Sequence, residues 1–287
     1  MRKLFYIALA GLLPLAMNAQ TLSTEAMPFV HLDYNPASLA MGSTMAPTAA
    51  VLPLSDFTLA AGGAYKYYMP DISGTKYYSG GVAGKYGKFG AAVSFTRGTG
   101  EEISGSGFTP AEILVNGGAA YAFTTNLSAG VNVLYAKEQL LSDYSNSAVA
   151  FDAFVAGRFD AIDFFAGVSS MGGKVSSEST GDFSLPSAAV AGVGYGIDIA
   201  EYHAVSARIK ADYFLSGAFA AGIGAEYSFD KLLFARVGYH YGGESVVPSF
   251  ASAGFGFHNG MFCLDAAYLF GSDVLNNSFS VSVGVRF

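Results

Sequence analysis

Nine charged residues occupy the polar side of runs in which apolar residues alternate with small or polar ones. They are Asp152, Arg158, Asp163, Arg208, Asp212, Glu226, Arg236, Asp265 and Arg286. Charges gathered on one face of a protein wall can form a selectivity ring or line a ligand site. They can also pair into a network that only fills and stabilises the interior. Because paired opposite charges neutralise each other, we favour the structural network over the ligand-lining role.

The expected hairpin register assigns partners to some of these charges. It places Arg208 across from Glu226, with Arg236 one diagonal further, and Arg158 beside Asp163 at its turn. A charge on a lipid-facing position would cost about 2–4 kcal/mol near the middle of a bilayer. We therefore expect all nine side chains to point inward.

Catalytic and metal chemistry have little support in the sequence. His240 and His258 share the polar face of two neighbouring runs, but antiparallel pairing puts them at opposite ends, so they cannot share a metal ion. The nucleophile motif G-x-S-x-G is absent. Gly192, Gly194 and Gly196 alternate along a strand with no helix after them, unlike a dinucleotide fingerprint. We predict a protein that is not an enzyme, with no metal and no cofactor.

Strands must position these residues, because the sequence alternates with period two from Phe57 onward. The last run shows the alternation best, since one face carries only Phe279, Val281, Val283, Val285 and Phe287. The pattern predicts fourteen strands, at 57–68, 75–86, 88–98, 108–123, 126–139, 145–159, 161–170, 185–197, 202–215, 218–229, 231–242, 247–258, 260–270 and 276–287. Short and longer links mostly alternate, as in outer-membrane barrels, and Ser216-Gly217 is a short exception.

The composition indicates which way the two faces point. Hydrophobic residues make up 52% of the 287 residues and charged residues only 13%, about half the usual charged fraction. This balance excludes a disordered chain, and 15 Lys+Arg against 22 Asp+Glu argues against a nucleic-acid partner. Beyond the N-terminus no apolar run is long enough for a membrane helix. We predict an all-β protein, a transmembrane antiparallel β-barrel of about 14 strands in contact with outer-membrane lipid.

The N-terminal part divides into two segments. Residues 1–19 combine Arg2 and Lys3, a short apolar stretch and Ala19, which predicts a cleaved signal peptide and export to the cell outer membrane. Residues 20–56 lack alternation and hold four prolines, so they are expected to plug the barrel formed by residues 57–287. A disordered periplasmic tail is the alternative for residues 20–56.

Four segments resemble the PorV/PorQ family, FadL-like outer-membrane barrels of Bacteroidota that include type IX secretion proteins. They are NPASLAMGST (35–44), FTPAEILVNGGAAYAFTTNLSAGVNVLYA (108–136), SLPSAAVAGVGYG (184–196) and ARVGYHYGGE (235–244), which continues into SAGFGFHNGMFCLDAAYLF (252–270). The resemblance implies a fourteen-stranded barrel with an N-terminal plug. The outer loops of this chain are shorter than those of the secretion members, which weakens the case that this protein handles secreted substrates.

The resemblance also implies roles for particular residues. Asn35, Pro36, Met41 and Gly42 match the family's plug motif. The final alternation, ending in Phe287, resembles the signal that the barrel-assembly machinery recognises during biogenesis. The expected function is a non-enzymatic partner or scaffold in protein secretion or surface assembly, with secretion-system or surface proteins as partners. The alternative is a FadL-like channel for hydrophobic small molecules, gated by the plug.

Overall fold

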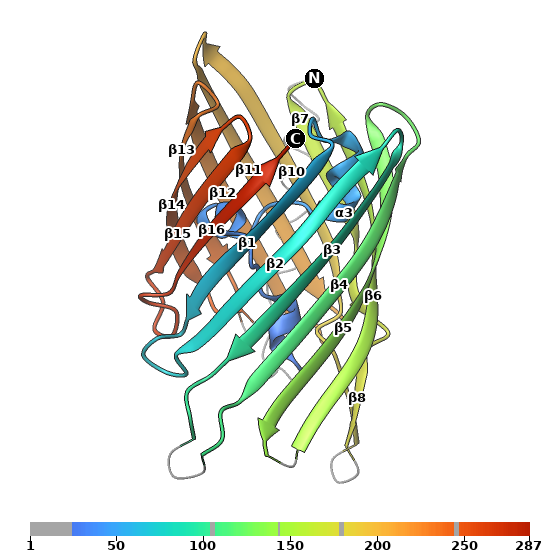
Figure 1. Ribbon diagram of the computed structural model, residues 1–287, viewed down its shortest axis with the longest axis vertical. Coiled ribbons are helices and arrows are strands. Elements are labelled where there is room, and N and C mark those ends of the chain that lie inside the picture. The colour runs from blue at the N-terminus through green and yellow to red at the C-terminus, as the bar shows by residue number, and fades with distance from the viewer. Residues whose placement is uncertain (1–24, 104–106, 143, 178–180, 244–246) are drawn as a thin grey trace.

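The computed structural model describes residues 25–103, 107–142, 144–177, 181–243 and 247–287, and the expected signal peptide lies outside them. Within these residues, fourteen antiparallel strands close into one barrel (Figure 1). The strands are β1 Leu59–Tyr68, β2 Thr75–Tyr86, β3 Phe89–Thr99, β4 Ala111–Ala122, β5 Leu127–Leu141, β6 Tyr144–Phe159, β7 Ile162–Met171, β10 Ala188–Ala200, β11 His203–Phe214, β12 Phe219–Phe229, β13 Leu233–Tyr241, β14 Phe250–Asn259, β15 Phe262–Phe270 and β16 Phe279–Arg286. The predicted fourteen-stranded antiparallel barrel is confirmed.

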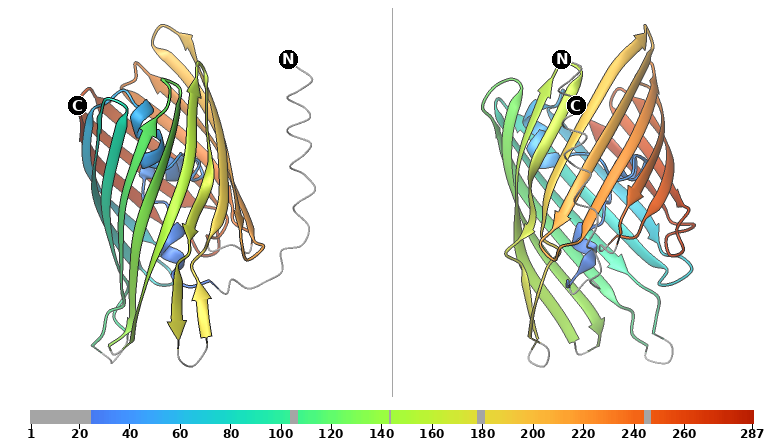
Figure 2. Two further views of the ribbon diagram at one scale, coloured as in Figure 1. Left: turned by 90° about the vertical axis from the view of Figure 1, so that its right-hand side faces the viewer. Right: turned by 180° about the vertical axis from the view of Figure 1, so that it is seen from behind.

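The wall follows the order of the chain with one interruption. β7 pairs with β10, because β8 (Lys174–Ser177) and β9 (Gly181–Ser184) form a separate hairpin between them. This hairpin extends from one end of the barrel (Figure 2). The sequence predicted only a link over 171–184, since this polar stretch lacks the alternation of a wall strand. β1 pairs with β16, with Tyr67 opposite Phe279, and this seam closes the barrel.

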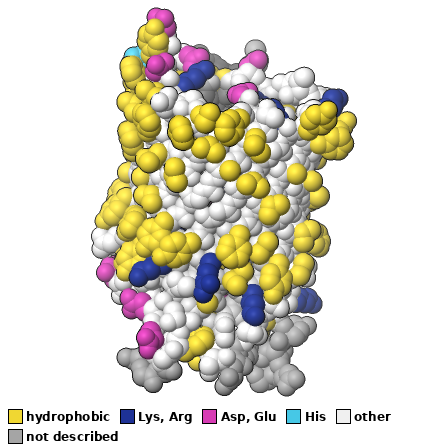
Figure 3. Space-filling view, viewed as in Figure 1, with side chains coloured by type: hydrophobic (Ala, Val, Ile, Leu, Met, Phe, Trp, Pro, Cys, Tyr) yellow, Lys and Arg dark blue, Asp and Glu magenta, His cyan; other side chains and the backbone are white. Residues whose placement is uncertain are grey.

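The outer surface of the barrel is apolar. Val82, Val131 and Val283 are each more than half exposed, because odd and even positions of a strand point to opposite faces. Figure 3 shows bulky apolar side chains toward both ends of the face formed by β1–β4. Fewer hydrophobic side chains show in the middle of that face. An apolar outer band is the surface expected of a barrel in lipid.

The residues of the expected assembly signal belong to this outer face. Phe279, Val281, Val283 and Phe287 are exposed, and Val285 is half-buried. The Phe287 N–H donates to the Leu59 carbonyl at 2.8 Å, which extends the pairing beyond β16. Recognition by the assembly machinery stays a prediction.

Residues 25–56 lie against the inner faces of the strands (Figure 2). They form η2 (Pro28–His31), α2 (Pro36–Ala40), α3 (Thr48–Val51) and η3 (Leu52–Leu54). α2 packs on β13–β16, whereas α3 packs on β3–β6, so the segment runs from one part of the wall to another. Phe29 and Leu39 join a buried cluster with inward-facing Leu134 and Phe250. The core of the protein therefore lies between this segment and the wall.

Candidate functional site: the barrel interior

The start of α2 is fixed by local sequence. The Asn35 side chain accepts a hydrogen bond from the Ala37 N–H at 3.0 Å, and Pro36 occupies the first helical turn, where its missing N–H costs nothing. Gly42, at φ +68°, follows the helix in the left-handed conformation. Met41 is buried. The four residues of the expected plug motif therefore shape a short helix and the turn after it.

Glycines in the wall let this turn approach the barrel backbone. A Cβ atom at Gly238 would lie 2.2 Å from the Gly42 nitrogen, and one at Gly224 would lie 2.4 Å from the Met41 carbonyl oxygen. A Cβ at Gly222 would lie 2.3 Å from the Gly42 carbonyl oxygen. No real Cβ tolerates such distances, so the contact between segment and wall depends on side chains being absent there.

Arg236 is the centre of an interior charge network and is only 4% exposed. Its Nε lies 2.5 Å from Glu226 Oε2, and its Nη1 lies 2.6 Å from Asp265 Oδ1. The His258 ring nitrogen Nε2 lies 3.0 Å from Asp265 Oδ2. Four strands, β12 to β15, thus contribute to one cluster, and carboxylates contact the buried guanidinium on two sides.

The predicted register is wrong for Arg208. It lies opposite Gly224, whereas Glu226 lies opposite Ser206 on one side and directly opposite Arg236 on the other. The cause is the tight link around Gly217, where φ is +95° and the Phe214 N–H donates to the Ala218 carbonyl. The link covers residues 215–218 rather than the predicted 216–217, and β12 is displaced by two residues relative to β11. The displacement by an even number keeps every side chain on its expected face.

Arg208 pairs instead with Asp163, which reaches it across β10. Arg158 does lie opposite Asp163, as predicted, but its Nη1 donates to the Leu54 carbonyl at 3.1 Å. Arg158 therefore holds the end of the N-terminal segment.

The remaining predicted charges bind nearby polar groups. Asp152 accepts from the Ser170 N–H at 2.8 Å and from Asn132 Nδ2 at 3.2 Å. Asp212 pairs with Lys210 at 3.1 Å. Arg286 Nε donates to the Gly260 carbonyl at 3.3 Å.

Sequence reasoning missed further ionisable residues in the interior, among them Lys66 and His31. Lys66 is 2% exposed, donates to the Asp33 carbonyl at 3.1 Å and lies 4.5 Å from the centre of the Tyr68 ring. Its parity within β1 could have revealed it. His31, on η2, packs edge-on against Phe214 with ring centres 4.8 Å apart. Burial lowers the pKa of His31 to about 4. No periodic signal marks His31, because its segment is irregular.

The two histidines that share a wall face are far apart. His240 lies opposite Phe250, whereas the His258 N–H donates to the Leu232 carbonyl at the other end of the same strand pair. Among the described residues, no group of three or more His, Cys, Asp or Glu side chains could hold a metal ion.

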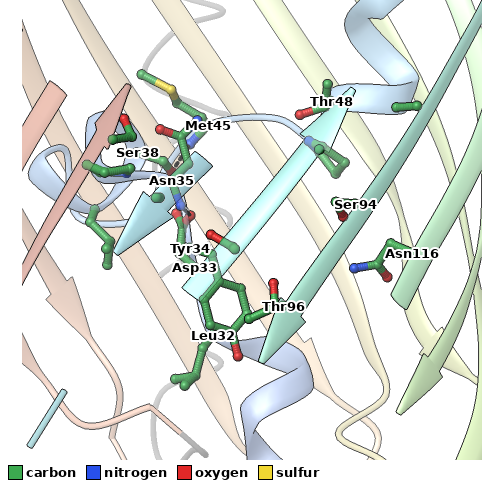
Figure 4. Close-up of a pocket in the computed structure, with 18 of the residues that line it drawn as sticks. Leu32, Asp33, Tyr34, Asn35, Ser38, Met45, Thr48, Ser94, Thr96 and Asn116 are labelled. Carbon is green, nitrogen blue, oxygen red and sulfur yellow. Dashed lines mark hydrogen bonds between the residues drawn. The ribbon is translucent and has the colours of Figure 1, made fainter. Parts of the chain in front are cut away.

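Where the N-terminal segment does not touch the wall, a cavity of about 680 Å³ lies between them. Ser94 and Thr96 on β3 and Asn116 on β4 supply polar groups to its lining. Figure 4 shows them facing the same space as Tyr34 and Met45 of the segment. Phe154, Phe165, Val190, Phe250 and Leu269 supply apolar surface elsewhere in the lining. The cavity can therefore hold a small molecule that has both polar and apolar parts.

These features define a class of protein. It is a closed antiparallel barrel with an apolar outer surface, a charge-paired interior and an internal cavity beside its N-terminal segment. No helix formed by the part of the chain that the structure describes has the length and apolar character needed to cross a membrane.

Solved structures with the same fold are outer-membrane-type barrels of the FadL kind. The Pseudomonas putida toluene transporter TodX matches with a TM-score of 0.59 and 12% identity, covering 88% of this chain and 98% of that chain. The Ralstonia pickettii toluene transporter TbuX matches with a TM-score of 0.57 and 13% identity, covering 88% and 97%. A Pseudomonas aeruginosa FadL homologue matches with a TM-score of 0.54 and 12% identity, covering 88% and 98%. These likenesses establish the fold.

Sequence comparisons add no closer relative. No protein-family model matches the chain, and no curated protein sequence is significantly similar to it. The PorV/PorQ resemblance therefore stays a prediction. The neighbours described above that are named by function are transporters rather than enzymes.

Proposed function

We propose that the protein is an outer-membrane channel for small hydrophobic molecules, with residues 25–56 as its plug. The observation that carries this proposal is the cavity of about 680 Å³ between that segment and the barrel wall. The segment packs on the wall through apolar clusters, and Lys66 and Arg158 each donate to one of its backbone carbonyls, which suits an element that shifts to let a molecule pass.

The solved neighbours add support for transport. Two of them are named as toluene transporters, and they share this barrel over most of the chain. The scaffold role in secretion, expected from the PorV/PorQ resemblance, has no structural observation of its own in its favour. The longest link between wall strands, residues 172–187, carries only the β8–β9 hairpin, which offers limited surface for holding a secreted protein.

Deletion of residues 25–56 tests the plug. The deleted barrel should conduct ions in a planar bilayer far better than the full chain, because the contacts of α2 and α3 with the wall are lost. Full-chain protein in liposomes should accelerate the entry of labelled toluene. Unchanged conductance would refute the plug, and unchanged toluene entry would refute the channel.

A further inference from the structure

Three charged side chains interrupt the apolar outer surface of the barrel, and we call them the cationic row. They are Lys76 on β2, Arg97 on β3 and Lys137 on β5. Each shares the outward parity of an exposed aromatic residue two positions away, namely Tyr78, Phe95 and Tyr135 respectively. On the wall strands that the structure describes, no other Lys, Arg, Asp or Glu takes an outward position. All three outward charges are therefore positive, although the whole chain carries a net charge of −7.

Strand register brings the three cations together. Arg97 lies opposite Ile113 of β4, and Ile113 lies opposite Lys137, so two strand spacings of about 4.8 Å separate the two cations. Lys76 lies opposite Thr99 and is therefore a diagonal neighbour of Arg97. Figure 3 shows Lys and Arg side chains in a row across this face of the barrel. Long side chains at this spacing can reach the same anionic group or two adjacent ones.

No ion pair within the protein accounts for the cationic row. In the described part of the chain, its three side chains form no salt bridge, and neither do Glu101 and Glu102, which follow β3. Lys76 and Arg97 are exposed, and Lys137 is half-buried. The row is therefore free to contact an anion outside the protein.

The position of the row selects one leaflet of the membrane. It lies at the end of the barrel that carries the longer links, such as 100–110 and 172–187. Outer-membrane barrels place short turns on the periplasmic side and longer loops outside, so this end belongs to the outer leaflet. At the opposite end of β2, β3 and β4, the outward residues are the uncharged Tyr86, Phe89 and Tyr121. The wall thus distinguishes the two leaflets by charge.

The surface beside the row favours a lipid over a soluble anion. In the next outward layer toward the middle of the barrel, Phe95 lies opposite Val115, which lies opposite Tyr135. An amphiphile can place its apolar chains on these residues while its anionic group meets the cations. Phosphate is the anionic group that suits the row, because a guanidinium binds it through two hydrogen bonds and an ammonium binds it as a point charge.

We propose that the cationic row binds the phosphate groups of lipid A, the phosphorylated anchor of lipopolysaccharide in the outer leaflet. The acyl chains of the bound lipid lie over Phe95, Val115 and Tyr135. This inference goes beyond the proposed channel function, and it rests on the outer-membrane position of the barrel rather than on what passes through it.

Lipid binding to the full-length protein in dodecyl maltoside tests the proposal. Fluorescence anisotropy compares labelled lipid A that carries its phosphates with the same lipid lacking them. The phosphorylated form should bind about tenfold more tightly, because only its headgroup neutralises the row. Equal binding of the two forms would overturn the proposal. Displacement of lipid A by equimolar inorganic phosphate would also overturn it, since the row would then be a site for a soluble anion.

Two paired substitutions locate the site. Arg97→Gln with Lys137→Gln should reduce the affinity for phosphorylated lipid A to that for the form without phosphates. Lys88→Gln with Lys231→Gln is the matched control, because it also removes two positive charges, from exposed links at the other end of the barrel. The control should keep the native preference. A preference retained by the first pair, or lost equally by both pairs, would contradict the assignment to the row.

Toluene entry into liposomes separates this inference from the proposed function. A preference for phosphorylated lipid A without accelerated toluene entry would refute the channel and support the lipid site. Accelerated entry with equal binding of both lipid forms would support the channel and refute the lipid site.

Discussion

Gly238→Ala should loosen the N-terminal segment, because this wall position has no room for a methyl group. The added Cβ would lie 2.2 Å from the Gly42 nitrogen and 2.3 Å from the Met41 carbonyl carbon. Ordinary carbon contacts begin near 3.4 Å, so the overlap exceeds 1 Å. Both atoms are backbone and cannot rotate away, and Gly238 is itself paired with Gly224 and Ser252.

The size of the effect follows from overpacking. Inserting a methyl group into a packed interior costs about 1–3 kcal/mol. A cost of about 2 kcal/mol raises roughly 30-fold the ratio of molecules whose N-terminal segment is displaced from the wall to molecules whose segment is bound to it, which we call seated. Conductance in planar bilayers should therefore rise, and chymotrypsin should cut residues 25–56 faster while the wall stays folded.

Gly117→Ala is the matched control for this experiment. Gly117 also lies within a wall strand, β4, but a Cβ there would have no atom within 4 Å. It should behave like the native chain in both assays. If folded Gly238→Ala barrels also kept native conductance and native protease resistance, the close packing of segment and wall would not control the pathway.

Three further predictions concern the charge network, the cap of α2 and His31. Arg236→Met should lower the free energy of unfolding by about 3 kcal/mol, because the carboxylates of Glu226 and Asp265 lose their cation. An unchanged midpoint of thermal unfolding together with altered uptake would instead favour a ligand-lining role for Arg236. Asn35→Ala should weaken seating of the segment by about 1 kcal/mol, measured as faster chymotrypsin cleavage, and native cleavage rates would contradict the capping role. The pKa of His31 is about 4 in the protein against 6.5 in a free chain, so the seated form favours the neutral ring. Binding of the N-terminal segment to the wall should be strongest above pH 6.5, weaken as the pH falls toward 4, and change no further below pH 4. Conductance should rise as this binding weakens, and His31→Phe should remove the dependence of conductance on pH.

The wall of the barrel was predictable because lipid and lumen impose opposite demands on alternate residues. β2 begins and ends where the alternation does, at Thr75 and Tyr86. The inward faces of Asp152 and Arg236 follow from the same parity. Neither conclusion needed a knowledge of tertiary contacts.

Register and interior packing were harder to predict. The pairing of Arg208 depends on the number of residues in the turn at Gly217, which alternation does not encode. The β8–β9 hairpin is polar and carries no membrane pattern. His31 entered the cavity lining through the path of an irregular segment, which depends on glycines far away in the sequence.

The seam between β1 and β16 has a consequence for assembly. The other wall pairings of the described strands join elements close in the chain, with β7 and β10 linked through the β8–β9 hairpin and the rest through a single link between consecutive strands. The seam instead joins the two ends of the wall, and until it forms, both edges expose unpaired N–H and C=O groups. Such groups cannot remain unpaired in hydrocarbon. Entry into the bilayer and closure of the cylinder must therefore proceed together, and the rate of closure should govern how quickly the protein matures.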